Sequence, residues 1–359
     1  MKRQLFIFIL ISLSFFNITY PQIKNYFVYT SLRSGDGVEI YKLDPVSGKL
    51  AIIETQKVTD APASMTFDHS RNTLLVCQRS AKTVAEFEID KKTGLLKLVN
   101  TTPILDNAMY LSTDNTDKYM FAAYYGASKA AVYPINSKSV VEKTPIQIDS
   151  TGFKTPHCIL TDRTNKYLFL SDKDADIIAQ YKFDISTGKM IPNNPAVINT
   201  PKGSGPRHFI FNKKGDIVYC VSEYANTVIA YRLNLKTGTL APFQTISMLP
   251  ESFKEKSTAA DIHITPDNRF LYASNRGHNS IVGYSIDKKS GELKLIGYFP
   301  SGKNPRSFNI DPTGNYLIAA GELSDELISY KIDQKTGKLS TVQTIPTGKQ
   351  PSWVLIAGY

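Results

Sequence analysis

The heptapeptide Asp287-Lys288-Lys289-Ser290-Gly291-Glu292-Leu293 recurs, with variations, along the whole chain. Each copy has an Asp or Asn, a short segment that ends in Gly, and an apolar residue two positions later. Because Asx and Gly favour tight turns, each copy predicts a β-hairpin. The copies are 46 to 53 residues apart, which is typical of four-stranded propeller blades of roughly 40–50 residues. Six copies start at Asp44, Asp90, Asp184, Asn234, Asp287 and Asp333, and Asn136 starts a seventh copy without the Gly.

Between these turns the chain alternates apolar and polar residues, and no stretch keeps a helical period beyond a turn or two. This pattern predicts an all-β protein. A second repeat, a strand that begins polar and becomes apolar, lies out of phase with the hairpins. The first hairpin has no such strand before it, and the last such strand has no hairpin after it. We therefore predict one seven-bladed β-propeller domain over residues 23–359, closed by pairing the C-terminal strand with the sheet of residues 25–50. The second repeat occupies residues 63–68, 109–113, 157–161, 207–211, 261–265, 306–310 and 351–355.

Residues 1–22 differ in composition from the rest of the chain. Lys2 and Arg3 precede an uncharged apolar run from Leu5 to Phe16, which is short for a bilayer span of roughly 20 residues. The pattern predicts a signal peptide, hence an exported protein with no stable membrane insertion after cleavage. A retained N-terminal anchor is the alternative.

Charge and cysteine content exclude several classes of protein. The formal net charge of +10 becomes +8 without Lys2 and Arg3, and the lysines lie mostly in turns with acids between them. No basic stripe interleaved with aromatic residues appears, so we expect no nucleic-acid partner. The cysteines, which sit in apolar strand patterns, are expected to be buried small hydrophobes rather than a disulfide framework. They are Cys77, Cys158 and Cys220.

Two columns of polar residues follow from the repeats. The first stands eleven positions before each hairpin Asp or Asn. The second stands at the start of the strands of the second repeat, where charge is costly because the strand becomes apolar at once. Since the start of an inner strand lies beside the end of its neighbour, we expect both columns at one mouth of the central channel. A ring of solvated loop ends is the alternative. The first column is Arg33, Arg79, Tyr125, Lys173, Glu223, Arg276 and Glu322; the second includes His157, Arg207, His208, Asp261 and Arg306.

At these positions the sequence resembles a known family. The motifs Gly205-Pro206-Arg207-His208, Ser222-Glu223, 260–267, 304–309 and 351–354 are similar to those of the seven-bladed propeller lactonases. This is the bacterial 6-phosphogluconolactonase type, to which fungal carboxymuconate lactonizing enzymes are related. The resemblance covers nearly all of the mature chain and is strongest from about 200 to 359. One departure is Tyr110, because relatives usually have His at that strand start.

The resemblance implies a lactone hydrolase, with His157, Arg207, Glu223 and Arg276 as its catalytic residues. Hydrolysis needs a base that takes a proton from water and donors for the carbonyl oxygen. Glu223 or His157 can be the base, and the arginines, Arg306 among them, suit an oxyanion. We assign substrate binding to six further residues on this basis, namely Lys173, His208, Asp261, His263, Arg306 and Glu322.

The expected ligand is a small-molecule lactone, bound by a monomer that uses no cofactor and no metal. His157, His208 and His263 are not in a compact ligand spacing, although a three-histidine site built from different blades is an alternative. Export favours an unphosphorylated aldonolactone or another carboxylated lactone, since the phosphorylated lactone is made in the cytoplasm. Two other functions stay open: a non-catalytic exported propeller that binds a sugar acid, a glycan or a protein, and a lactonizing cycloisomerase.

Overall fold

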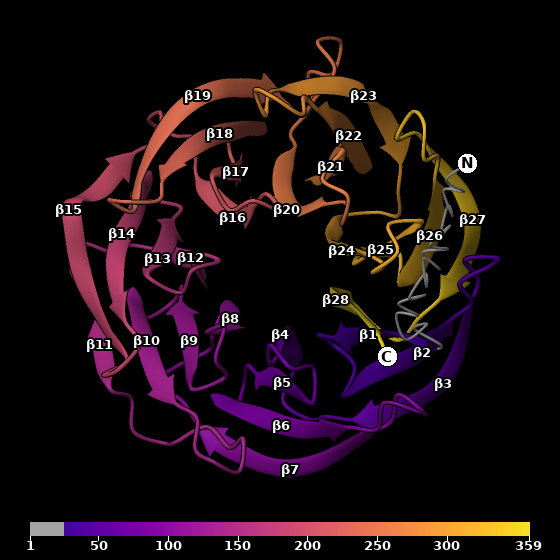
Figure 1. Cartoon of the computed structure of the whole chain (residues 1–359). Coiled ribbons are helices and arrows are strands. Elements are labelled where there is room, and N and C mark those ends of the chain that lie inside the picture. Colours follow the sequence, from indigo (N-terminus) through magenta and orange to yellow (C-terminus); the bar gives the residue numbers. More distant parts are fainter. Residues whose placement is uncertain (1–24) are drawn as a thin grey trace, which may run out of the picture.

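A computed structural model describes residues 25–359 and shows seven four-stranded antiparallel sheets around a central axis (Figure 1). The predicted all-β seven-bladed propeller is therefore confirmed. The predicted signal peptide, residues 1–22, lies outside the described residues. Within residues 25–359, no helix is long and apolar enough to cross a membrane.

Each blade is a meander whose first strand lines the central opening and whose fourth strand lies on the outer rim (Figure 1). Blade 1 contains β28 (Pro351–Gly358), β1 (Tyr26–Leu32), β2 (Gly37–Leu43) and β3 (Leu50–Lys57). Blade 2 contains β4 (Pro62–Phe67), β5 (Thr73–Gln78), β6 (Thr83–Ile89) and β7 (Leu96–Pro103). Blade 3 contains β8 (Tyr110–Thr113), β9 (Tyr119–Tyr124), β10 (Lys129–Pro134) and β11 (Gln147–Asp149).

The other four blades follow the chain in the same order. Blade 4 contains β12 (Pro156–Thr161), β13 (Tyr167–Asp172), β14 (Ile177–Asp184) and β15 (Lys189–Asn199). Blade 5 contains β16 (Pro206–Phe211), β17 (Ile217–Ser222), β18 (Thr227–Asn234) and β19 (Thr239–Ser247). Blade 6 contains β20 (Thr258–Ile264), β21 (Phe270–Arg276), β22 (Ser280–Ile286) and β23 (Leu293–Pro300). Blade 7 contains β24 (Pro305–Ile310), β25 (Tyr316–Gly321), β26 (Glu326–Ile332) and β27 (Leu339–Pro346).

The C-terminal strand closes the ring as the two repeats predict. β28 pairs antiparallel with β1 from Tyr26↔Gly358 to Leu32↔Pro351, with one register shift. Blade 1 is thus built from both ends of the domain, and its sheet has four strands like those of the other blades.

The repeated hairpins tie each blade to the next one. At Gly238 φ is +69°, and a Cβ atom would lie 2.0 Å from Cδ1 of Tyr167 in the preceding blade. The Tyr167 hydroxyl donates to the Lys236 carbonyl in the same turn, 2.7 Å away. Gly is therefore required both by the backbone angle and by the aromatic ring packed on it. Blade 3 lacks this Gly, and its third and fourth strands are joined by a longer loop with one isolated bridge, Ile135↔Val141.

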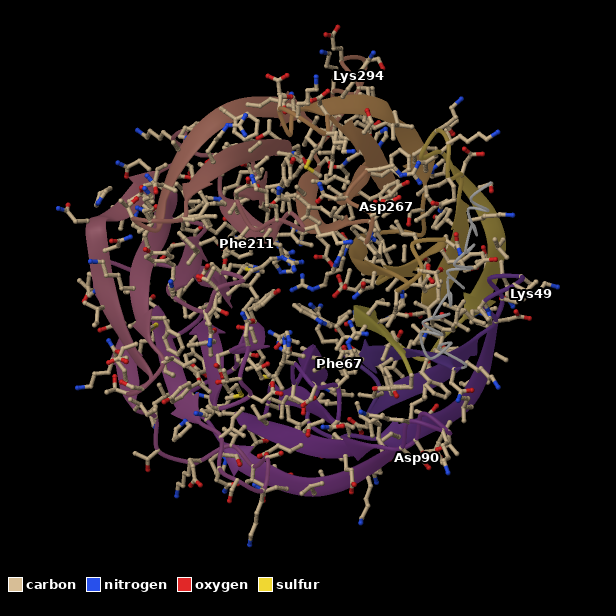
Figure 2. All side chains as sticks on the ribbon, viewed as in Figure 1. Lys49, Phe67, Asp90, Phe211, Asp267 and Lys294 are labelled. Atoms are coloured by element: carbon tan, nitrogen blue, oxygen red, sulfur yellow. The ribbon has the colours of Figure 1, made fainter. Side chains whose placement is uncertain are left out.

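The hydrophobic core lies between neighbouring sheets rather than in one central mass. One cluster, for example, joins Phe169 and Ile178 of blade 4 to Phe209, Cys220 and Tyr231 of blade 5. All three cysteines are free and buried, as predicted. Because the core is distributed around the ring, the axis is left to polar side chains, whose nitrogen and oxygen atoms gather in the central opening (Figure 2).

Candidate active site

Every inner strand except β8 begins with an irregularity in its pairing, and polar residues stand at these strand starts. In blade 5 the register shifts between Pro206 and Phe209, so Pro206 pairs with Ser222 while Phe209 pairs with Cys220. Comparable shifts occur at the starts of β4, β12, β20 and β24. A bulge of this kind re-aims side chains. Arg207 and Glu223, which follow Pro206 and Ser222, are thereby brought to the same mouth.

The two predicted columns meet in what we call the Glu223 cluster, formed by Lys173, Arg207, Glu223 and Arg276. Oε2 of Glu223 lies 2.9 Å from Nε of Arg207, and Oε1 lies 3.1 Å from Arg276 Nη2 and 3.3 Å from Lys173 Nζ. The Lys173 ammonium also lies over the rings of Tyr125 and Tyr224, 5.0 and 4.7 Å from their centroids. Three blades thus contribute cations to one carboxylate.

Donor groups in this cluster are left without acceptors. Arg207 donates from Nη1 to the Ala260 carbonyl, and Arg276 donates from Nη2 to the Ala259 carbonyl, 2.9 Å away. The buried Nε–H groups of both arginines, by contrast, have no hydrogen-bond acceptor among residues 25–359. Arg207 Nε is thus close enough to Glu223 to form an ion pair, but its N–H group does not point at the carboxylate in the geometry of a hydrogen bond. Such donors are suited to a ligand oxygen.

The cluster carries more positive than negative charge. Burial works to raise the pKa of Glu223, but the charges of Arg207, Arg276 and Lys173 outweigh it and lower that pKa to about 2. The pKa of Arg207 is also lowered, to about 9, by burial and by Arg276, against the attraction of Glu223. Because even the buried arginine is destabilised as a cation, the cluster favours a further anion.

A second network lies around Asp261, which is buried. Its Oδ1 is 2.8 Å from His208 Nδ1, and its Oδ2 accepts from Ser307 Oγ at 3.0 Å and lies 3.4 Å from His263 Nε2. Burial and the nearby Arg207 lower the pKa of His208 to about 4, although Asp261 opposes this. His208 is therefore neutral at neutral pH and is fixed in orientation by Asp261.

His157 lies beside this network at the start of β12. Its ring centroid is 5.1 Å from that of His208, and 3% of the residue is exposed. Burial, followed by the charge of Arg207, holds its pKa well below 6.5, so the imidazole is neutral. Its buried Nδ1 atom has no hydrogen-bond partner among residues 25–359. It is thus a candidate proton acceptor.

Across the mouth, a second set of charges, the Glu322 cluster, is formed by Arg33, Arg79, Arg306 and Glu322. Glu322 Oε1 lies 3.0 Å from Arg33 Nη1 and 4.0 Å from Arg306 Nε. The structure thus brings all predicted site residues to the channel, in two charge clusters and one histidine–aspartate network. Arg33 and Arg79, which stood in the predicted column, were not assigned a role from sequence.

Two aromatic neighbours of the site, Trp353 and Tyr224, were not assigned to it from the sequence. Trp353 lies in the channel, with ring centroids 5.5 Å from Tyr110 and 5.6 Å from His208. Tyr224 follows Glu223 directly, and its position in the motif was the available signal. Within residues 25–359, no group of three or more His, Cys, Asp or Glu side chains is placed to hold a metal ion.

Comparison with known proteins identifies the family. The model of the family described as "Lactonase, 7-bladed beta-propeller" matches residues 22–109 and 105–356. The chain belongs to the seven-bladed β-propeller lactonase family.

Curated relatives in this family are named 6-phosphogluconolactonase. That of Cronobacter sakazakii is 30% identical over 285 residues, which cover 79% of this chain and 83% of the relative. That of Serratia proteamaculans is 34% identical over 192 residues, or 54% of this chain. The latter match spans a little over half of the relative's length, 57%.

Two solved structures share the whole architecture. The periplasmic gluconolactonase PpgL of Pseudomonas aeruginosa is 25% identical, with a TM-score of 0.86 over 93% of this chain and 99% of that chain. A putative 6-phosphogluconolactonase of Bacteroides uniformis is also 25% identical, with a TM-score of 0.85 over 94% of this chain and all of that chain (100%). The resemblance seen in the sequence motifs is thereby confirmed at the level of family and fold.

Proposed function

We propose that the protein hydrolyses the ester bond of a sugar-acid lactone of the 6-phosphogluconolactone type. Family membership and the names of the relatives support this reaction class. The single observation that carries the proposal is the Glu223 cluster, where two buried arginine N–H groups without acceptors stand beside an ionised carboxylate. That arrangement suits a reaction in which negative charge develops on a carbonyl oxygen.

The reaction adds water across the ring ester. The water oxygen bonds to the carbonyl carbon, the carbonyl oxygen becomes negative, and the ring C–O bond then breaks. The proton taken from water is returned to the departing ring oxygen, which leaves a hydroxy acid. Arg207 and Arg276 stabilise the negative oxygen, and Lys173, which approaches the same oxygen of Glu223 as Arg276, adds a third positive charge.

Of the two candidate bases, the geometry favours His157. Both oxygens of Glu223 already face cations within 3.3 Å, so neither is free to take a proton from water. His157 is neutral, and its Nδ1 has no partner among the described residues. We therefore propose that His157 takes the proton from water, while Glu223 holds the three cations in place.

We also propose that the enzyme acts outside the cytoplasm. The N-terminal pattern of residues 1–22 supports export, and one structural relative at 25% identity is named a periplasmic gluconolactonase. Export is compatible with an aldonolactone or a carboxylated lactone supplied from outside the cell.

A lactone panel tests the proposal. The purified protein is incubated with glucono-δ-lactone, its 6-phosphate and a carboxylated lactone, and proton release from the hydroxy acid is followed. We expect at least one lactone to be consumed well above its spontaneous rate, and the rate to fall in the His157→Gln variant by roughly 10². If the parent protein leaves every lactone at the spontaneous rate, the hydrolase proposal fails and a binding function takes its place.

A further inference from the structure

The Glu322 cluster has more cationic donors than its own residues can satisfy. Glu322 is 3% exposed and carries the only carboxylate of the cluster, and its Oε2 already accepts from the Asn304 amide at 2.6 Å. Arg79 Nε reaches only the amide oxygen of Asn107, at 3.3 Å. Arg306 Nη2 is 3.5 Å from the sulfur of Met109, a weak acceptor. Within residues 25–359, two of the three guanidiniums therefore lack a close carboxylate partner.

The charges of the cluster repel one another in a partly buried place. Three guanidiniums and one carboxylate leave two positive charges. Burial, and next the charge of Arg33, lower the pKa of Arg79. Burial lowers the pKa of Arg306 to about 10, with Arg276 and Arg33 adding to the effect and Glu322 opposing it. Side chains that only stabilised the fold would not be gathered in this way.

These guanidiniums also line one small cavity at the mouth. Trp353 and Met109 are part of its wall, together with Arg33, Arg79 and Arg306. Trp353 also borders a deeper cavity of about 100 Å³, with His208 and Asp261. The indole thus lies between the arginines and the histidine–aspartate network.

We propose that Arg33, Arg79 and Arg306 bind an oxyanionic substituent of the substrate, a phosphate monoester or a carboxylate, remote from the lactone ester. This inference rests on the proposed lactonase function. Guanidinium forks match the oxygens of either group, and the cavity that the three forks line, about 10 Å³ in volume, has room for one of these oxygens. β24, which carries Arg306, contacts β21, which carries Arg276, so the two clusters adjoin on neighbouring blades.

Arg79 is the residue with which to test the site, because it has no ion-pair partner to lose in the part of the chain that the structure describes. Replacing it by Gln removes a cation that its surroundings disfavour, so the variant should melt at the same temperature as the parent or higher. Arg79→Lys keeps the charge and loses the fork. Lys82→Gln is the matched control, since Lys82 lies on the same β5–β6 loop, pairs with Asp106 at 3.0 Å and is outside the cavity.

Binding is measured first, without turnover. Trp353 is the only tryptophan of the chain, so its fluorescence reports on the cavity that it lines. Inorganic phosphate is titrated into each protein at constant ionic strength, with chloride as the balancing salt. We expect a saturable change in the parent and in Lys82→Gln, weakened about tenfold or more in Arg79→Gln, and by less in Arg79→Lys.

Selectivity is measured next, on glucono-δ-lactone, its 6-phosphate and a carboxylated lactone. We expect the parent to prefer an acidic lactone, and the ratio of kcat/KM for acidic over neutral lactone to fall about tenfold in Arg79→Gln. The acidic lactone preferred by the parent identifies the substituent as phosphate or carboxylate. An unchanged ratio in Arg79→Gln, with unchanged phosphate binding, overturns the inference while leaving the hydrolase intact. Arg79-dependent phosphate binding in a protein that hydrolyses no lactone supports the anion site and refutes the hydrolase.

Discussion

Glu223→Gln removes one negative charge from among three cations and keeps the shape of the side chain. The pKa of Glu223 falls from 4.5 to about 2 on folding. At about 1.4 kcal/mol per pKa unit, the ionised carboxylate therefore contributes about 3 kcal/mol to the free energy of unfolding at pH 7. The side chain is 11% exposed, so solvent does little to screen this contribution.

The sign of the pH dependence follows from the direction of the shift. A carboxyl group whose pKa is lowered by folding contributes fully above its unfolded pKa, and the contribution is lost as the pH falls through the folded value. About 1.4 kcal/mol should remain at pH 3, so the difference between parent and variant should shrink by about 2 kcal/mol between pH 7 and pH 3. Other acids titrate in both proteins and cancel in the difference.

Urea denaturation at several pH values, followed by Trp353 fluorescence, measures this difference. Glu88→Gln is the control, because Glu88 is 65% exposed and its nearest cation, Lys97, is 4.0 Å away; we expect no measurable change. A difference below about 1 kcal/mol at pH 7 would refute the electrostatic account, as would a difference that does not shrink in acid. Turnover on the identified lactone should fall roughly 10²-fold, since Arg207 and Arg276 lose their common partner; a fully active variant would exclude any catalytic role for Glu223.

Three further predictions concern the scaffold and the N-terminus. Gly238→Ala should destabilise the protein by about 2–4 kcal/mol in denaturation experiments, because the new Cβ atom clashes with Tyr167 and the residue must also adopt a positive φ. Gly152 has a similar φ, but a Cβ atom there would have nothing within 4 Å, so Gly152→Ala should destabilise the protein clearly less. Equal losses of stability in the two variants would contradict the packing argument. Deleting residues 351–359 should leave one edge of β1 unpaired and cause aggregation, whereas a cooperative transition near that of the parent would show that β28 is dispensable. Protein recovered from the periplasm should lack residues 1 to about 22 by intact mass, and full-length protein in the cytosol would argue against export.

The fold was predictable because the same physical requirements recur in every blade. A hairpin Gly must accept positive φ and a bulky apolar side chain from the preceding blade, so it repeats at a visible period. The closure could be deduced from counting, since the two repeats are out of phase by one strand. Blade 3 departs from the pattern where its Gly is missing, and there the structure has a longer loop and a strand of only three residues, β11.

The site was predictable in position but not in its partners. The columns placed Arg207 and Glu223 at one mouth, and the ion pair between them is confirmed at 2.9 Å. Glu223 also pairs with Lys173 and Arg276, so side chains from three blades meet at this carboxylate. The spacing of residues within one repeat does not predict contacts between blades. The bulges at the strand starts were likewise not visible, although the Pro before Arg207 and the Pro before Arg306 stand at two of them.

The separation of core and site explains how such a charged mouth is tolerated. The apolar contacts that stabilise the ring lie between sheets, as in the cluster of Phe169 and Phe209, whereas the charged side chains gather in the central opening (Figure 2). Arg207 is 1% exposed and its pKa is lowered to about 9, so its positive charge is a cost to the folded state. The folded state tolerates this unfavourable charge because the apolar core between the blades stabilises the ring. A negatively charged ligand oxygen that binds beside Arg207 removes the electrostatic cost. Since Arg207 and Arg306 are both unfavourable as cations, each cluster should bind an anionic group more tightly than a balanced ion pair would, and that is the property a lactonase for an acidic substrate requires.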